Sequence, residues 1–335
     1  MNVPEWVWWT TVIVTMTVLL FDVVIIGRRP HEPSRREVSV ALSIYVGAAI
    51  LFGIGVWFFA GQQYGTEFFA GWLTEYSLSV DNLFIFIIIM SRLGVPRAYQ
   101  QEALMIGIVL ALIFRGIFIA LGAAVIAQFS WVFYLFGAFL IYTGAKLAKE
   151  GPNEDEEYEE ARLVTWVRKT LPHTDDYRGG KLFVREGGRW LLTPMFIVAV
   201  ALGTTDLLFA LDSIPAIFGL TKEPYLVFTA NVFALMGLRQ LYFLIGGLLQ
   251  RLVYLSYGLA FLLAFIGVKL VLHALHENEL PFINGGEHVT WAPEIPISVS
   301  LGVIVLTLLV TTVASLAASR REQQRLDSGS DTHAG

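Results

Sequence analysis

The chain contains no cysteine among its 335 residues, and only 15% of its residues are charged. Without cysteine it has no disulfides, thiolate metal ligands, Fe–S clusters or cysteine nucleophiles. Soluble globular proteins carry about 25% charged residues, so this composition argues against a soluble fold. Basic residues are outnumbered 23 to 28, and the formal charge of −5 disfavours a general nucleic-acid binder. A Gly-x-x-x-x-Gly-Lys-Ser/Thr motif is also absent, so nucleotide hydrolysis has no support.

Apolar residues make up 56% of the chain, and they occur in long runs. Nine of these runs are long enough to cross a hydrocarbon core of about 30 Å as a helix. The sequence therefore predicts an all-α polytopic membrane protein with about nine transmembrane helices, at 6–26, 37–60, 66–91, 99–127, 129–149, 191–219, 226–249, 251–272 and 294–318.

The basic residues predict the orientation of these spans. With the N-terminus outside, the inner segments hold 19 lysines and arginines, whereas the outer segments hold only Lys222. The positive-inside rule therefore predicts an outer N-terminus and an inner C-terminus. The predicted location is the cell inner (plasma) membrane, which the chain crosses several times.

Two stretches of the chain repeat one pattern of polar residues. An acid, five residues, a second acid and a small polar residue occur in the third span and again in the sixth: Glu75, Asp81 and Asn82, then Asp206, Asp212 and Ser213. The next span of each half carries an arginine, Arg115 or Arg239, and the one after it ends in Gly-x-Lys-Leu, at Lys146 or Lys269. Because three spans form each unit, the second copy crosses the bilayer in the opposite direction. Such inverted repeats are typical of secondary transporters, whose substrate site lies near the midplane.

This repeat predicts how the chain is divided. We expect an N-terminal two-helix segment, a three-helix repeat, a cytoplasmic linker, a second three-helix repeat, an outer loop, a last transmembrane helix and a disordered tail, at 1–65, 66–149, 150–190, 191–273, 274–293, 294–319 and 320–335.

The four acids inside the spans require compensation, because a carboxylate at the centre of a span costs about 2.5–3.5 kcal/mol. One interpretation is structural, with Arg115 and Arg239 forming buried ion pairs with them. The other is that the acids line a cation path. Six residues along a helix advance about 9 Å, too far for two acids of one helix to hold one ion.

We therefore expect the second acid of each motif to form one central site with the polar residue beside it: Asp81, Asp212, Asn82 and Ser213. The first acids would act as separate staging carboxylates, Glu75 toward the outside and Asp206 toward the inside. Arg115, Arg239, Lys269 and Asp22 are assigned to charge pairing. Pro215 predicts a break in the sixth span, which would free a carbonyl.

All candidate ligands inside the spans are oxygens, which suit Mg²⁺, Ca²⁺ or Mn²⁺ better than Cu⁺ or Zn²⁺. The outer loop gathers three histidines and three glutamates that could collect metal, although a plain surface loop is favoured: His273, His276, Glu277, Glu279, Glu287 and His288.

The paired motifs resemble those of the TerC/Alx family of integral membrane proteins. The similarity covers about residues 5–318 and is carried by Glu75-Tyr-Ser-Leu-Ser-Val-Asp81-Asn82, by Arg115-Gly-Ile-Phe-Ile-Ala-Leu-Gly and by Phe209-Ala-Leu-Asp212-Ser213-Ile-Pro215. The resemblance implies a cation exporter related to the LysE superfamily, with Mn²⁺ leaving the cytoplasm, and a historical link to tellurium resistance. It also implies that the motif acids carry the function, and that Asp22 occupies a position where the family tends to have an acid. One departure is Gly203, where family members often have an acid.

The resulting prediction is a secondary transporter that exports divalent cations, with Mn²⁺ first, by alternating access. Two alternatives stay open: a non-transporting membrane component of tellurite or envelope-stress resistance, and a Ca²⁺/H⁺ exchanger. An enzyme is not expected, because no nucleophile–base pair is recognisable. The predicted partners are membrane lipid and metal ions, and the candidate protein partners are a second copy of the chain or another membrane protein. Neither nucleic acid nor a tightly bound cofactor is expected.

Overall fold

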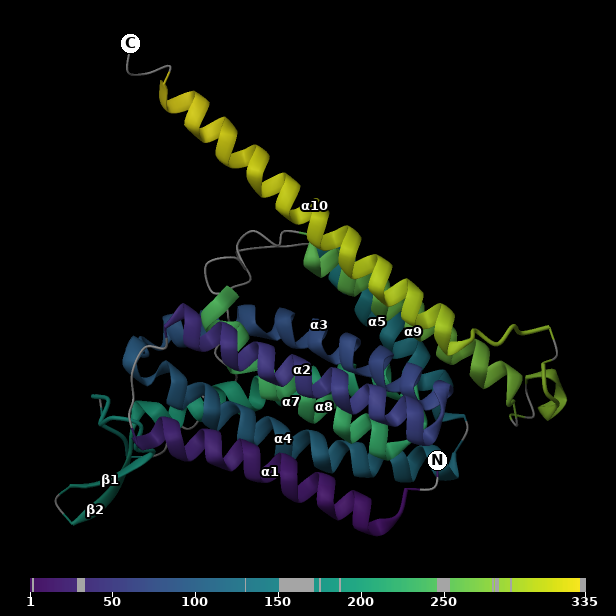
Figure 1. The fold of residues 1–335 in the computed structure, drawn as a ribbon, viewed down its shortest axis with the longest axis horizontal. Coiled ribbons are helices and arrows are strands. Elements are labelled where there is room, and N and C mark those ends of the chain that lie inside the picture. The colour runs from purple at the N-terminus through teal and green to yellow at the C-terminus, as the bar shows by residue number, and fades with distance from the viewer. Residues whose placement is uncertain are drawn as a thin grey trace.

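The computed structural model describes residues 1, 3–28, 34–129, 131–150, 172–174, 176–186, 188–245, 254–278, 280, 283–289 and 291–331. Within these residues the chain forms nine long helices (Figure 1). They are α1 (Glu5–Arg28), α2 (Arg35–Ala60), α3 (Gln62–Arg92), α4 (Arg97–Gln128), α5 (Val132–Glu150), α7 (Pro194–Phe218), α8 (Pro224–Ile245), α9 (Leu255–His276) and α10 (Ile297–Asp331).

Eight of the described helices, α2 to α5 and α7 to α10, are long and apolar enough to cross a membrane. The prediction of an all-α polytopic membrane protein is confirmed. Successive helices run up and down, so the N-terminus and the α2–α3, α4–α5, α7–α8 and α9–α10 connections gather at one end of the bundle (Figure 1). We call this the outer end, following the orientation that the basic residues predict.

The α2–α3 connection consists of one residue, Gly61. Its φ of 113° and ψ of 162° lie in a region that is essentially restricted to glycine. A single residue can therefore reverse the chain only because it has no Cβ, and this fixes α3 directly to the end of α2.

Helices of the two halves pack against each other in pairs. α3 packs on α8, α4 on α7 and α5 on α9, and α3 also contacts α7. Exchanging the two halves converts the α3–α8 pair into the α7–α4 pair and leaves α5–α9 unchanged. This arrangement favours the inverted repeat, which stays a prediction.

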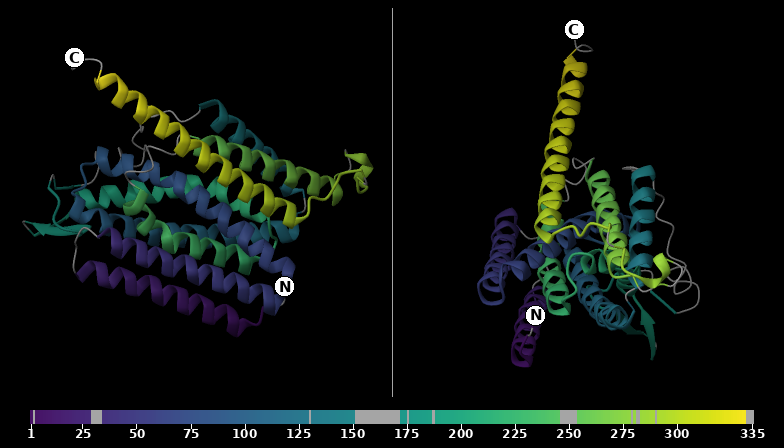
Figure 2. Two further views of the ribbon diagram at one scale, coloured as in Figure 1. Left: turned by 45° about the horizontal axis from the view of Figure 1, so that its top comes forward. Right: turned by 90° about the vertical axis from the view of Figure 1, so that its right-hand side faces the viewer.

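Small residues bring α5 and α9 into close contact. A Cβ added to Gly137 would lie 2.7 Å from the carbonyl oxygen of Gly267, and one added to Gly144 would lie 2.7 Å from that of Ala260. Membrane helices commonly pack through such small residues, because the backbones can then approach each other. These two helices and α10 lie next to one another, inclined to the rest of the bundle (Figure 2).

Three features differ from the sequence predictions. α7 is continuous through Pro215 to Phe218, so the predicted break in the sixth span is wrong. The proline lies in the last turn, where a missing hydrogen bond disturbs only the helix end. Residues 320–331, predicted as part of a disordered tail, continue α10, whose Arg-, Glu- and Gln-rich sequence favours a helix.

The linker also contains structure that its polar composition did not indicate. Strands β1 (Phe183–Glu186) and β2 (Arg189–Leu192) form an antiparallel hairpin, with Gly188 in the turn at a φ of 79°. Tyr177, in the segment before this hairpin, fixes the linker to the bundle, because its hydroxyl donates to the carbonyl of Leu93 at 2.8 Å. The acidic run 153–157 lies outside the described residues.

Candidate functional site

Four helices meet at a buried charged cluster halfway through the bundle. Glu75 lies 13 residues from the start of α3, Arg115 lies 13 residues from the end of α4, and Asp206 is the middle residue of α7. At about 1.5 Å per residue, each side chain lies nearly 20 Å from the outer end of its helix. Asn231 of α8 completes the cluster.

Arg115 holds the cluster together. Its Nη1 donates to Glu75 Oε2 at 2.5 Å and to Asn231 Oδ1 at 2.8 Å, while its Nη2 donates to Asp206 Oδ1 at 3.5 Å. The side chain of Asn231 is itself oriented by α8, because its Nδ2 donates to the carbonyl of Val227 at 3.0 Å. One guanidinium therefore joins the first acids of both repeat motifs.

The cluster is almost completely shielded from solvent, since Glu75, Arg115 and Asp206 are 0%, 1% and 1% exposed. Two carboxylates face one guanidinium, so the fully ionised cluster carries one surplus negative charge. Glu75 Oε1 and Asp206 Oδ2 have no hydrogen-bond partner among the described residues. Unsatisfied buried oxygens are uncommon in native folds and mark a place where a cation or a proton would be stabilised.

Buried hydroxyl groups lie on the same two helices. Thr74 and Ser79 of α3 and Ser213 of α7 are at most 2% exposed, and none of their hydroxyl oxygens has a partner in the described part of the chain. Asn82 is also buried, at 6% exposure. The predicted ligands Asn82 and Ser213 thus lie inside the bundle and are not exposed to lipid.

The structure corrects the predicted roles of Glu75 and Asp206. They are not separate staging carboxylates on opposite sides of a central site, because both bind Arg115. The structural interpretation correctly placed Arg115 beside the acids. Asn231 was missed, although an asparagine two helical turns before Arg239 in an apolar span is a signal that could have indicated it.

The side chains of Asp81, Asp212 and Asp22 lie outside the described residues, so their predicted roles stay predictions. The helices that carry the first two still constrain them. Leu83 of α3 shares a core cluster with Leu202 of α7, whereas Trp72 shares another with Ile214. α3 and α7 therefore run in opposite directions.

This register separates the backbones of Asp81 and Asp212. Asp81 lies level with about residue 204 of α7, eight residues from Asp212, which corresponds to about 12 Å along the helix axes. The backbones of the two aspartates therefore lie on opposite sides of the Arg115 cluster.

The two remaining charge-pairing candidates have different surroundings. Arg239 is half-buried on α8, and its Nη2 donates to the side-chain oxygen of Gln240 at 2.6 Å when that amide is oriented to satisfy both of its polar atoms. Lys269 is half-buried on α9 and lines a pocket at the outer end. Its repeat counterpart, Lys146, is exposed near the inner end of α5.

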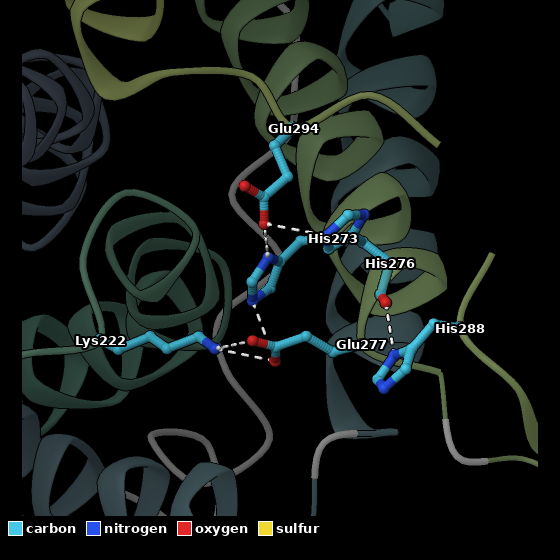
Figure 3. Close-up of polar contacts among 6 residues, drawn as sticks. All are labelled: Lys222, His273, His276, Glu277, His288 and Glu294. Carbon is cyan, nitrogen blue, oxygen red and sulfur yellow. Dashed lines mark hydrogen bonds and ion pairs between the residues drawn. The ribbon is translucent and has the colours of Figure 1, made fainter. Parts of the chain in front are cut away.

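The outer loop forms a network of ion pairs (Figure 3). Lys222 donates to both carboxylate oxygens of Glu277 at 2.9 and 3.2 Å, and His273 lies 3.3 Å from the same carboxylate. Glu294 Oε1 lies 3.8 Å from His276. Burial raises the pKa of Glu277, but Lys222 and the two histidines outweigh this effect and lower the pKa below its ordinary value.

These contacts join α9, the α7–α8 loop and the segment before α10. His288 adds a contact from its Nδ1 to the carbonyl of His276 at 2.7 Å, while Glu287 is exposed and Glu279 lies outside the described residues. Among the described residues no group of three or more His, Asp or Glu side chains could hold a metal ion. The plain surface loop that the sequence favours stays a prediction.

Gly203 has a packing role in this chain. A Cβ there would lie 3.1 Å from Leu110 and 3.7 Å from Phe114, both on α4. The residue therefore lets α7 approach α4, which positions Asp206 beside Arg115.

A bundle of eight described helices that are long and apolar enough to cross a membrane defines a polytopic integral membrane protein. A family model for the TerC family of integral membrane proteins matches residues 60–323. The chain belongs to this family.

Similar proteins occur in several bacteria. An uncharacterized membrane protein of Mycobacterium tuberculosis is 47% identical, over 95% of this chain and 81% of its own length. One from Myxococcus xanthus is 39% identical over 91% and 90%. The protein named "Putative membrane-bound redox modulator Alx" of Salmonella typhi is 35% identical over 95% and 96%. No solved structure matches the chain.

Proposed function

We propose that this protein is a secondary transporter that exports divalent cations, with Mn²⁺ as the first candidate, from the cytoplasm. The observation that carries the proposal is the mid-bundle cluster, in which two carboxylates share one guanidinium and each keeps one oxygen without a hydrogen-bond partner among the described residues. A purely structural ion pair would need one acid for one arginine. The second acid leaves a negative charge that attracts a cation to the centre of the bundle.

The register of α3 and α7 suggests a two-step path. Asp81 lies on the inner side of the Arg115 cluster and Asp212 on its outer side, about 12 Å apart. A cation would bind the inner aspartate first and the outer aspartate after the halves rearrange. The cluster between them would separate the two access routes, because an ion can pass only when contacts to Arg115 are broken.

The donor atoms support a hard divalent cation. Carboxylate, amide and hydroxyl oxygens from Asn82, Ser213 and the acids are the groups available near the centre. Mn²⁺, Ca²⁺ and Mg²⁺ prefer such ligands, while Cu⁺ prefers sulfur. A redox effect of the kind named for the Alx relatives could not arise from thiol–disulfide exchange within this chain, which has no cysteine.

The test is manganese export from cells that express the protein. The wild type should lower cellular Mn²⁺ and raise tolerance to it, while Asp81→Asn and Asp212→Asn should each lose this effect with normal amounts of protein in the membrane. Glu186→Gln, an exposed acid on the β1–β2 hairpin, is the matched control and should behave as the wild type. Full protection by both aspartate variants would refute the assigned path.

Flux into proteoliposomes distinguishes the alternatives. Competition among Mn²⁺, Ca²⁺ and Mg²⁺, with and without a pH gradient, separates a manganese exporter from a Ca²⁺/H⁺ exchanger. Deletion within the linker 150–190 tests the non-transporting role in tellurite or envelope stress. A deletion that abolishes the cellular phenotype but leaves ion flux intact would favour that role.

A further inference from the structure

A pocket of about 320 Å³ opens at the outer end of the bundle, between the start of α3, the end of α7 and the last turns of α9. Glu67, Thr221, Lys222, Lys269 and His273 contribute its polar lining. The pocket lies on the outer side of the Arg115 cluster, and α3 runs from the pocket inward to this cluster. The sequence singled out Lys269 and His273 of its lining, but not Glu67.

Glu67 provides the buried negative charge of this pocket. It is 7% exposed, and both of its oxygens accept hydrogen bonds, from Gln63 Nε2 at 3.0 Å and from Thr221 Oγ1 at 2.6 Å. Thr221 follows α7, so the carboxylate joins the two helices that carry the repeat motifs. Glu67 also precedes Glu75 by eight residues, or about 12 Å along α3. The same helix therefore leads from the pocket to the central cluster.

Lys269 faces this carboxylate from α9. The two side chains line the same pocket, and the charge of Glu67 acts on the ammonium, yet within the described residues they form no hydrogen bond or ion pair with each other. A half-buried lysine that is not bonded to this carboxylate is free to move toward or away from it. Lys146, at the corresponding repeat position, is exposed.

The other charged groups of the pocket are already engaged. Lys222 is held by Glu277 (Figure 3), and its Nζ lies 5.2 Å from the ring centroid of Phe133. Glu223 is paired with the amino group of Met1. Glu67 and Lys269 are therefore the charges that respond to an ion entering the pocket.

We propose that this pocket is the outer vestibule of the export path, and that Lys269 is a tethered cation that competes with the departing metal ion for Glu67. The inference rests on the proposed function. A metal ion leaving the centre would bind Glu67 and push the nearby ammonium away, and the returning ammonium would then expel the ion to the outside. The same charge repels ions that re-enter. The absence of a three-ligand cage among the described residues of this end suits a place of release.

The experiment measures how external Mn²⁺ inhibits export from cells loaded with Mn²⁺. Lys269→Gln should lower the external concentration for half-inhibition by about threefold to tenfold, as removal of one partly screened charge implies. Lys269→Arg should retain the wild-type value. Lys146→Gln is the matched control and should leave it unchanged. A Lys269→Gln variant that exports normally and keeps wild-type sensitivity would overturn the proposal while the transport function stands.

A binding measurement keeps the inference testable without transport. Mn²⁺ titration of the purified protein, followed by electron paramagnetic resonance, should show one additional weak site in Lys269→Gln. The additional site should vanish in the double variant Lys269→Gln/Glu67→Gln. If the single variant gains no site, the competition between ammonium and metal is refuted. A wild type that exports no divalent cation would instead refute the proposed function, and the vestibule with it.

Discussion

Substitution of Arg115 by methionine should be the most destabilising single change in the central cluster. The change removes a guanidinium that holds Glu75 at 2.5 Å and Asp206 at 3.5 Å, and it leaves two carboxylates in a site that is at most 1% exposed. At an effective dielectric constant of about 20, unit charges about 4 Å apart attract by about 4 kcal/mol. Removing one partner of a buried ion pair costs about 3–5 kcal/mol, and we expect a loss in this range.

The sign of the effect should reverse when an acid is removed instead. Glu75→Gln keeps the shape of the side chain and an oxygen that can accept from Arg115, and it leaves one acid for one arginine. We therefore expect unchanged or higher stability, together with loss of export, because the surplus charge that attracts the cation is gone. The triple variant Arg115→Met/Glu75→Gln/Asp206→Asn should recover most of the stability lost in Arg115→Met, since no buried charge remains.

Unfolding by SDS in mixed micelles, followed by the fluorescence of the nine tryptophans, measures these differences. Arg178→Met, which removes one partner of an exposed ion pair with Glu186, is the control and should cost no more than about 1 kcal/mol. An Arg115→Met variant within about 1 kcal/mol of the wild type, or a triple variant no more stable than Arg115→Met, would refute the electrostatic account of the cluster.

Three further predictions concern packing, the turn and the loop. Gly137→Ala should destabilise the α5–α9 contact by about 1–3 kcal/mol, because its Cβ would lie 2.7 Å from the carbonyl of Gly267; SDS unfolding measures this. Gly61→Ala should cost about 1–3 kcal/mol in the same assay, since its φ is 113°, and a cost near zero would contradict the backbone argument. Lys222→Met should speed hydrogen exchange in the loop around Glu277 at neutral pH. Because the pKa of that carboxyl is lowered, the contact stabilises the fold above pH 4.5 and is lost as the pH falls through the lowered value, where wild type and variant should converge.

Much of the helical architecture could be predicted from the sequence, because the hydrophobic runs report directly on which segments can cross a bilayer. The predicted span 37–60 compares with α2 at Arg35–Ala60, and 99–127 with α4 at Arg97–Gln128. The error at Pro215 has a physical reason. Pro215 removes only its own backbone donor, and the bonds from Gly219 to the carbonyl of Pro215 and from Thr221 to that of Ile217 continue the helical pattern beyond it. The β1–β2 hairpin forms from short strands in a polar segment, which have no strong periodic signal.

The charged cluster could be predicted only in part. Spacing placed Glu75 and Asp206 inside the membrane but could not give the relative heights of α3 and α7, which depend on side-chain packing across the bundle. That register brings both acids to Arg115 and sets the second acids about 12 Å apart. Glu67 escaped notice because it lies at a span end, where an acid is expected to reach water. Its burial depends on Thr221, 154 residues away.

The last helix is longer than a membrane crossing requires. Its apolar part, Ile297–Ser319, has 23 residues and spans about 34 Å, whereas the twelve residues that follow add about 18 Å. With the predicted orientation, α10 acts as a rigid spacer that carries the chain away from the inner lipid surface (Figure 1). A fluorescent reporter fused behind it would therefore sit clear of the inner mouth of the bundle and leave entry of ions unobstructed.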